Sequence, residues 1–158
     1  MKTTAPIIEK LSDDWIPQIY LEKIRPLRTR SYELNVPGHE NKTDILHTLL
    51  GIELKTGNIR LSCPDLATAR YLRVFACLGC RQIAVPYDIT KISALADELE
   101  VAWHRALLLL AKNFREKSPQ VRGRARSALI RKIRGEIDAI GAGDALPEFN
   151  QSTKQRNI

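Results

Sequence analysis

Apolar residues recur at helical spacing in four parts of the chain. Helices are expected over residues 15–24, 64–78, 88–113 and 118–140. The longest of them keeps an apolar stripe at three-and-four spacing, made of Ile92, Leu95, Leu99, Ala102, Ala106 and Leu110. Pro119 directly after Ser118 suits a helix start, and Gly79 and Gly141 suit helix ends. The pattern therefore predicts two long helices in the C-terminal part of the chain.

A second pattern alternates between apolar and polar residues. Residues 51–55 and 58–62 both follow it, and Thr56-Gly57 joins them. This arrangement is typical of a β-hairpin with one apolar face and one polar face. The hairpin is expected over about residues 51–62.

The remaining segments are short or irregular. We expect strands over residues 31–36 and 82–86 and a helical turn over residues 44–50. Residues 1–12 are expected to be frayed, and residues 144–158 to form a flexible polar tail. The order of elements predicts a single α+β domain over residues 1–143, in which helices cover a small mixed sheet that contains the hairpin.

Composition narrows the class of protein. The chain has 158 residues, of which 44% are hydrophobic and 27% charged, as in globular proteins. Its longest apolar run, Ala106–Ala111, is far shorter than the roughly 20 residues that cross a bilayer. The N-terminus lacks the apolar stretch of a signal peptide, and three cysteines do not form a disulfide framework. These features predict a cytoplasmic protein without a membrane partner.

Positive charge is concentrated in residues 112–134. This stretch carries nine Lys and Arg residues against Glu116 alone, a net charge of +8, whereas the whole chain carries +7. Such a concentration is typical of a surface that binds a polyanion, and the arginine fork suits phosphate. We therefore predict a regulatory protein that binds nucleic acid and has neither catalytic activity nor a cofactor. The candidate binding residues are Arg115, Lys117, Arg122, Arg124, Arg126, Arg131, Lys132 and Arg134.

A helical projection of the last helix separates two faces. Its apolar side holds Val121, Ala125, Leu129, Ile133, Ile137 and Ile140. The opposite side holds Arg124, Arg131, Lys132 and Arg134. Arg122 and Arg126 project near the apolar side, so either the helix starts nearer Ser127, after a basic loop, or these two side chains extend along its edge. Phe114 is the only aromatic residue in the basic region, which favours duplex or structured nucleic acid.

Two observations favour a protein partner instead. Asp97, Glu98 and Glu100 could pair with the basic helix, inside one molecule or across a dimer. Residues Leu107–Leu110 are apolar on every helical face, which predicts burial in the core or in a homodimer. The alternative function is therefore an adaptor or homodimeric scaffold that binds an acidic protein surface.

A second basic group holds Lys23, Arg25, Arg28 and Arg30. If these residues lie beside the C-terminal helix, the basic surface doubles. If they do not, they are ordinary cations near a helix end, where the helix dipole favours them.

Asp44 and the segment Glu53-Leu54-Lys55 form a pattern that resembles the Asp…(Asp/Glu)-x-Lys motif of restriction-endonuclease-like nucleases. The resemblance covers some 50 residues, and the predicted order of a helix, three strands, a helix and a strand is similar to that family's core. It implies a metal-dependent nuclease in which the two acids hold a divalent metal and Lys55 orients water or stabilises charge. Two features depart from that family: Asp44 falls on a predicted helical turn, and Lys55 lies at the hairpin tip. Without catalysis, Glu53 and Lys55 are the outward positions of an amphipathic strand that faces Arg60.

Cys77 and Cys80 have the spacing of a metal-binding or redox pair, and Cys63 could lie near them. A zinc site would need a histidine as well, from His39, His47 or His104. A redox role is disfavoured because the pair falls at a predicted helix C-terminus, where the dipole opposes a thiolate. We therefore expect small buried residues here and no metal site.

Overall fold

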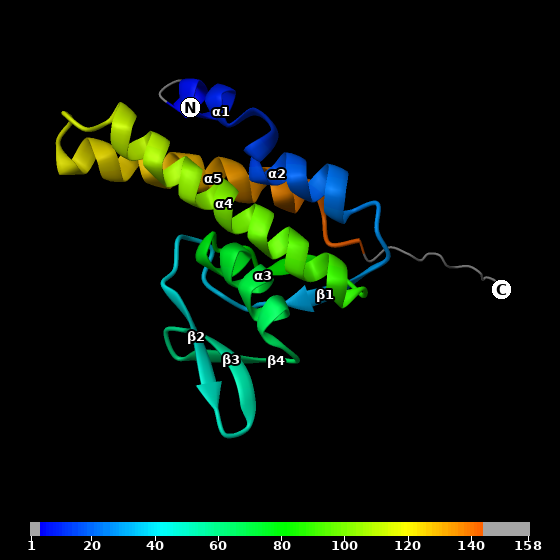
Figure 1. The fold of residues 1–158 in the computed structure, drawn as a ribbon. Coiled ribbons are helices and arrows are strands. Elements are labelled where there is room, and N and C mark those ends of the chain that lie inside the picture. The colour runs from blue at the N-terminus through cyan, green and yellow to red at the C-terminus, as the bar shows by residue number, and fades with distance from the viewer. Residues whose placement is uncertain (1–3, 144–158) are drawn as a thin grey trace.

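The computed structural model describes residues 4–143 as an α+β fold (Figure 1). The chain opens with helices α1 (Ala5–Leu11) and α2 (Ile16–Ile19) and a π-helical segment, η3 (Tyr20–Ile24). The strands are β1 (Thr29–Glu33), β2 (Thr43–Thr48), β3 (Gly51–Thr56), β4 (Ile59–Cys63) and β5 (Gln82–Pro86). The longer helices are α3 (Leu66–Cys77), α4 (Ile89–Asn113) and α5 (Pro119–Ile140). The predicted fold class, the β3–β4 hairpin and the two long C-terminal helices are confirmed. The tail predicted over residues 144–158 lies outside the described residues.

The strands form two antiparallel sheets and not one mixed sheet. β1 pairs with β5, and β2, β3 and β4 form a separate three-stranded sheet. The two sheets are kept apart by the loop between β1 and β2, because this loop passes over the C-terminal end of α3. Leu34 donates its backbone N–H to Arg81, and Asn41 donates its backbone N–H to Cys77. The loop therefore carries the chain away from β5, and β2 begins in the other sheet.

Gly79 makes this crossing possible. It follows α3 with a φ of +82°, and a Cβ built on it would lie 2.4 Å from the backbone oxygen of His39. The backbone N–H of Gly79 donates to Ala76 and that of Cys80 donates to Phe75, which is the Schellman pattern of hydrogen bonds. Gly79 therefore ends α3 as predicted, and it also allows a close backbone contact.

Residues 44–50 were predicted to form a helical turn, and this prediction is wrong. Most of the segment lies in β2, which pairs with β3 along its whole length. The hydroxyls of Thr43 and Thr56 lie 2.9 Å apart in a buried cross-strand pair. Pairing with β3 supplies hydrogen bonds that an isolated helical turn of seven residues could not match.

Residues 1–12 are expected from the sequence to be frayed. This prediction is wrong for residues 5–11, which form α1. Ile7 and Leu11, one helical turn apart, are both buried, and α1 packs against α4. Tertiary packing therefore stabilises a helix that is too short to form alone.

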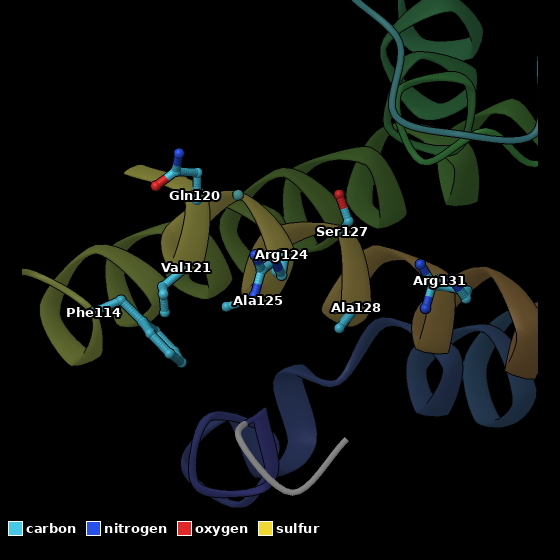
Figure 2. A pocket seen from close by; sticks show the side chains of 9 residues that line it. Phe114, Gln120, Val121, Arg124, Ala125, Ser127, Ala128 and Arg131 are labelled. Carbon is cyan, nitrogen blue, oxygen red and sulfur yellow. The ribbon is translucent and has the colours of Figure 1, made fainter. Parts of the chain in front are cut away.

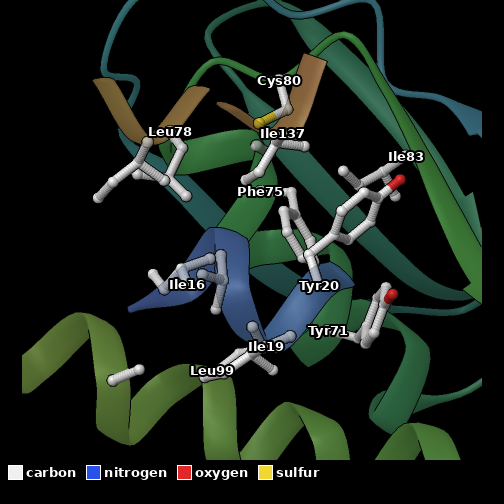
Figure 3. Close-up of a cluster of buried hydrophobic side chains, with 14 of the residues drawn as sticks. Ile16, Ile19, Tyr20, Tyr71, Phe75, Leu78, Cys80, Ile83, Leu99 and Ile137 are labelled. Atoms are coloured by element: carbon white, nitrogen blue, oxygen red, sulfur yellow. The ribbon is translucent and has the colours of Figure 1, made fainter. Parts of the chain in front are cut away.

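The buried side chains form one core that extends from Ile7 to Ile137. At its centre the ring of Phe75 lies 5.8 Å from that of Tyr20 and 5.3 Å from that of Tyr71 (Figure 3). Both tyrosine hydroxyls are hydrogen-bonded: Tyr71 donates to the carbonyl of Ala84, and Tyr20 donates to that of Gly141. These bonds join the N-terminal helices, α3, β5 and the end of α5.

The helices α4 and α5 run antiparallel, and the turn between them lies at one end of the molecule, away from both sheets (Figure 1). The Leu107–Leu110 segment is covered only in part: Leu110 is buried, whereas 57% of Leu108 is exposed. Residues 4–143 therefore do not bury this segment on every side. Within residues 4–143, no helix combines the length and apolarity that crossing a membrane requires.

Candidate nucleic-acid interface

The helix α5 starts at Pro119, before most of the predicted basic residues. The Ser118 hydroxyl accepts the backbone N–H of Val121 at 3.2 Å and caps the helix. Arg122 and Arg124 are therefore helical, and the alternative in which the helix starts near Ser127 is wrong. Of the eight candidate residues, Arg115 and Lys117 alone lie in the turn between α4 and α5.

The buried face of α5 agrees with the predicted apolar side over most of its length. Its buried residues are Ala125, Leu129, Ile130, Ile133 and Ile137. Val121 is 37% exposed and Ile140 is half-buried, so the apolar contact is weaker at the two ends of the helix. The first turns of α5 therefore present most of their surface to solvent, beside the end of α4.

Three of the eight candidate residues bind a carboxylate or the end of another helix; among the other five, Arg122 donates from Nη1 to the carbonyl of Arg115 at 3.5 Å. Arg126 donates from Nε and Nη2 to the two carboxylate oxygens of Glu40, at 2.7 and 2.5 Å, and this pairing raises the pKa of Arg126. Lys132 pairs with Glu136 at 3.0 Å, one turn along α5. Arg134 donates from Nη1 to the carbonyl of Leu78 at 2.9 Å and so satisfies the end of α3. These three cations contribute to the fold.

The other five are exposed and form no ion pair with any residue that the structure describes. They are Arg115, Lys117, Arg122, Arg124 and Arg131, and we call them the unpaired cations. Lys112, in the last turn of α4, has the same properties. Lys112 lies in the basic stretch of residues 112–134, so the sequence could have identified it as a candidate as well. Their positive charge is open to solvent and to a partner.

The acids that could have neutralised this charge lie elsewhere. Arg70 of α3 binds Asp97 at 2.5 Å and Glu100 at 2.7 Å, and its pKa is raised by these hydrogen bonds. Glu98 pairs with Lys23, whose pKa is raised as well. The expectation that these acids pair with the basic helix inside one molecule is therefore wrong.

A broad hollow lies along the first half of α5 (Figure 2). It measures about 880 Å³, opens to solvent, and is lined by Phe114 and a face of α5. Arg124 and Arg131 lie on this face with the small residue Ala128 between them. Seven residues of helix place the two arginines about 10 Å apart along the axis. The hollow therefore combines an accessible surface with two unpaired guanidinium groups.

The second basic group does not enlarge this surface. Lys23 pairs with Glu98, and Arg25 lies against Gly143, beyond the C-terminal end of α5. Arg28 and Arg30 contact the ring of Tyr87, next to the start of α4. The group therefore lies far from the turn that joins α4 and α5.

The three residues of the nuclease-like pattern share one face of the three-stranded sheet. Asp44 pairs with Lys55 across β2 and β3, and Glu53 lies two positions from Lys55 on the same strand. Glu53 binds Arg60 of β4 at 3.0 Å. The surrounding fold differs from the predicted order, because four strands precede α3 and β5 pairs with β1 in the other sheet.

The three cysteines are free thiols and poor nucleophiles. Burial raises the pKa of Cys63 to about 11 and that of Cys80 to about 12, and it also raises the pKa of Cys77. Within residues 4–143, the structure brings together no group of three or more His, Cys, Asp or Glu side chains that could hold a metal ion.

Comparison with known proteins returns no match for this chain: no family model, no curated protein and no solved structure matches it.

Proposed function

We propose that this protein binds nucleic acid without catalysis, through phosphate contacts made by the unpaired cations. One observation carries the proposal: five exposed cations between residues 115 and 131 form no ion pair within the described residues, while Asp97, Glu98 and Glu100 of α4 pair with other cations. Charge that remains unneutralised in one region raises the local concentration of polyanions and steers their approach.

The geometry favours a phosphate backbone as the ligand. Arg124 and Arg131 lie on one face of α5, about 10 Å apart along its axis, so both can contact phosphates of one strand. Arginine binds phosphate with two parallel hydrogen bonds, which fixes the orientation of the polymer. Contacts of this type give affinity and salt dependence but no sequence preference. Because the chain's free thiols suit a reducing compartment, the proposal places the protein in the cytoplasm.

A second candidate function is association with a protein, through the outer face of α4. Val101 and Leu108 lie seven residues apart on this face and are 61% and 57% exposed. Two exposed apolar residues on one helix face favour a homodimer or an adaptor surface. Light scattering should then give twice the mass of one chain, and Leu108→Glu should restore the monomer. A monomer at all concentrations would contradict the dimer.

The proposed function is tested by removing three unpaired cations. We expect the variant Arg122→Ala/Arg124→Ala/Arg131→Ala to bind a duplex more weakly than wild type. The slope of log K against log salt should become shallower by about 0.9 for each lost phosphate contact. Fluorescence anisotropy with a labelled 20-base-pair duplex, from 50 to 200 mM salt, gives both quantities.

Two control variants separate the interface from general charge. Lys42→Ala/Lys55→Ala/Arg81→Ala removes the same charge from positions outside the interface and should keep the wild-type slope. Arg122→Lys/Arg124→Lys/Arg131→Lys keeps the charge and should keep most of the affinity. Equal losses in the two alanine variants, or wild-type binding that ignores salt, would contradict the proposed function.

A further inference from the structure

A row of aromatic and guanidinium groups lies on one face of the small β1–β5 sheet. Thr29 pairs with Pro86, and the backbone N–H of Tyr87 donates to Arg28, so Arg28 and Tyr87 are neighbours across the two chain segments. Arg30 and Tyr32 follow at alternate positions and therefore share the face of Arg28. We call Arg28, Arg30, Tyr32 and Tyr87 the Tyr–Arg row.

The members of the row stack on one another. The Arg28 guanidinium lies 4.8 Å from the ring centre of Tyr87. The Arg30 guanidinium lies 4.9 Å from the ring centre of Tyr32 and 5.6 Å from that of Tyr87. Arg30 also donates from Nη2 to the Tyr32 hydroxyl at 2.7 Å. Cation–π contacts hold these flat side chains in fixed positions. Less conformational entropy is therefore lost when another flat group binds to them.

The row is open at Tyr87, which is 53% exposed. A hollow of about 400 Å³ adjoins this ring and is lined by Arg28, Pro86, Asp88 and Lys91, among others. Within the described residues, Arg28, Arg30 and Lys91 form no ion pair. The carboxylate of Asp88 accepts both the backbone N–H and the hydroxyl of Thr90, which lowers the pKa of Asp88 and keeps its charge at the start of α4. The hollow thus combines an exposed aromatic ring with cations that form no ion pair among the described residues, beside the charged Asp88.

We propose that the Tyr–Arg row binds an unpaired base of a single-stranded nucleic acid. A base stacks on the exposed ring of Tyr87 or on the Arg28 guanidinium, since both present flat π surfaces. The phosphates on either side of that base then meet Arg30 and Lys91. A ligand that is both flat and anionic uses every group of the site, whereas an acidic peptide would use only the charges.

This site is separate from the interface of the proposed function. Tyr87 directly precedes the N-cap of α4 and Lys91 lies in its first turn, whereas Lys112 lies in its last turn and Arg115 just beyond it. The helix has 25 residues, which spans about 37 Å. The two sites therefore use different residues, and each can be removed without touching the other.

The test compares a single strand with a duplex. Labelled twelve-residue oligothymidylate and a twelve-base-pair duplex are titrated with wild type, Tyr87→Ala and Tyr87→Phe, with fluorescence anisotropy as the measurement. We expect Tyr87→Ala to weaken single-strand binding on the order of tenfold, because one stacked base is lost, and to leave duplex binding unchanged. Tyr87→Phe keeps the ring and should bind like wild type. Thermal melting by circular dichroism confirms that each variant is folded.

Three results would overturn the assignment. The first is that Tyr87→Ala binds the single strand as tightly as wild type does. The second is that Tyr87→Ala loses as much affinity for the duplex as for the single strand. The third is that it loses as much affinity for a polyglutamate peptide of matched charge. The last of these would identify an acidic-protein site instead. Arg122→Ala/Arg124→Ala distinguishes the two proposals: if this variant binds the duplex like wild type, the proposed function fails, while the result for Tyr87 still stands.

Discussion

Two charged regions of the α4–α5 pair differ in what their charges do. The acids Asp97, Glu98 and Glu100 all pair with cations of other elements, Arg70 and Lys23. The unpaired cations, which extend from the α4–α5 turn to the middle of α5, have no acidic partner within the described residues. Both regions are equally conspicuous in the sequence. The difference teaches that a run of charge is available to a partner only where the fold leaves it without ion pairs.

The largest expected effect comes from reversing charge among the unpaired cations. Arg122→Glu/Arg124→Glu should weaken duplex binding on the order of 100-fold at about 0.1 M salt, since two attractive contacts become repulsive. Filter binding or anisotropy measures the change. The matched control Lys42→Glu/Arg81→Glu alters net charge equally and should cost far less affinity. If both variants lose the same affinity, net charge and not the location of the cations controls binding.

A second prediction divides the basic stretch into its paired and unpaired members. Arg134→Ala should lower the free energy of unfolding by about 1.5 kcal/mol, because the carbonyl of the buried Leu78 loses a charged donor. Arg131→Ala, which removes an exposed side chain, should stay within about 0.5 kcal/mol of wild type. Urea denaturation of both variants gives the comparison. Similar values for the two would show that Arg134 has no structural role.

Moving one cation from the paired set to the unpaired set gives a smaller effect. Glu40→Gln releases Arg126 from its carboxylate partner. We expect duplex affinity to rise about threefold and the salt slope to steepen by up to about 0.9, as one more phosphate contact forms. An unchanged slope would place Arg126 outside the interface.

The smallest effect is expected from the acidic region. Asp97→Asn/Glu100→Gln should lower stability by less than about 1 kcal/mol, because exposed ion pairs contribute little. Duplex affinity at about 0.15 M salt should change less than twofold. Glu100 lies twelve residues, or about 18 Å, from Lys112 along α4, and the screening length is about 8 Å. A larger change in affinity would show that the two regions act together.

The elements that could be predicted from the sequence are those with local signals. The stripe of α4, the cap at Ser118 and the turn of the β3–β4 hairpin all lie within a few residues of the elements that they define. β2 could not be predicted, because its partner β3 decides its conformation. α1 had a weak local signal in Ile7 and Leu11, and contact with α4 decides the outcome there.

The candidate interface was predictable in composition but not in detail. The charge of residues 112–134 marks the location, yet the sequence does not show which cations are already paired. Glu40 lies 86 residues from Arg126, and Leu78 lies 56 residues from Arg134. The Tyr–Arg row has the same origin, since β1–β5 pairing brings Tyr87 to Arg28. Contacts between distant segments decide these details, and no local pattern records them.

The ends of the described chain are joined by contacts that determine when the protein can fold. Trp15 donates from its indole nitrogen to Glu136, and Tyr20 donates to Gly141; each pair is 121 residues apart. On the ribosome, the N-terminal helices emerge long before their partners on α5 exist. Until then, the apolar side chains of α1 and α2 remain exposed to chaperones and to other chains. The basic helix is therefore also the last part of the core to be synthesised, and the domain closes only when it arrives.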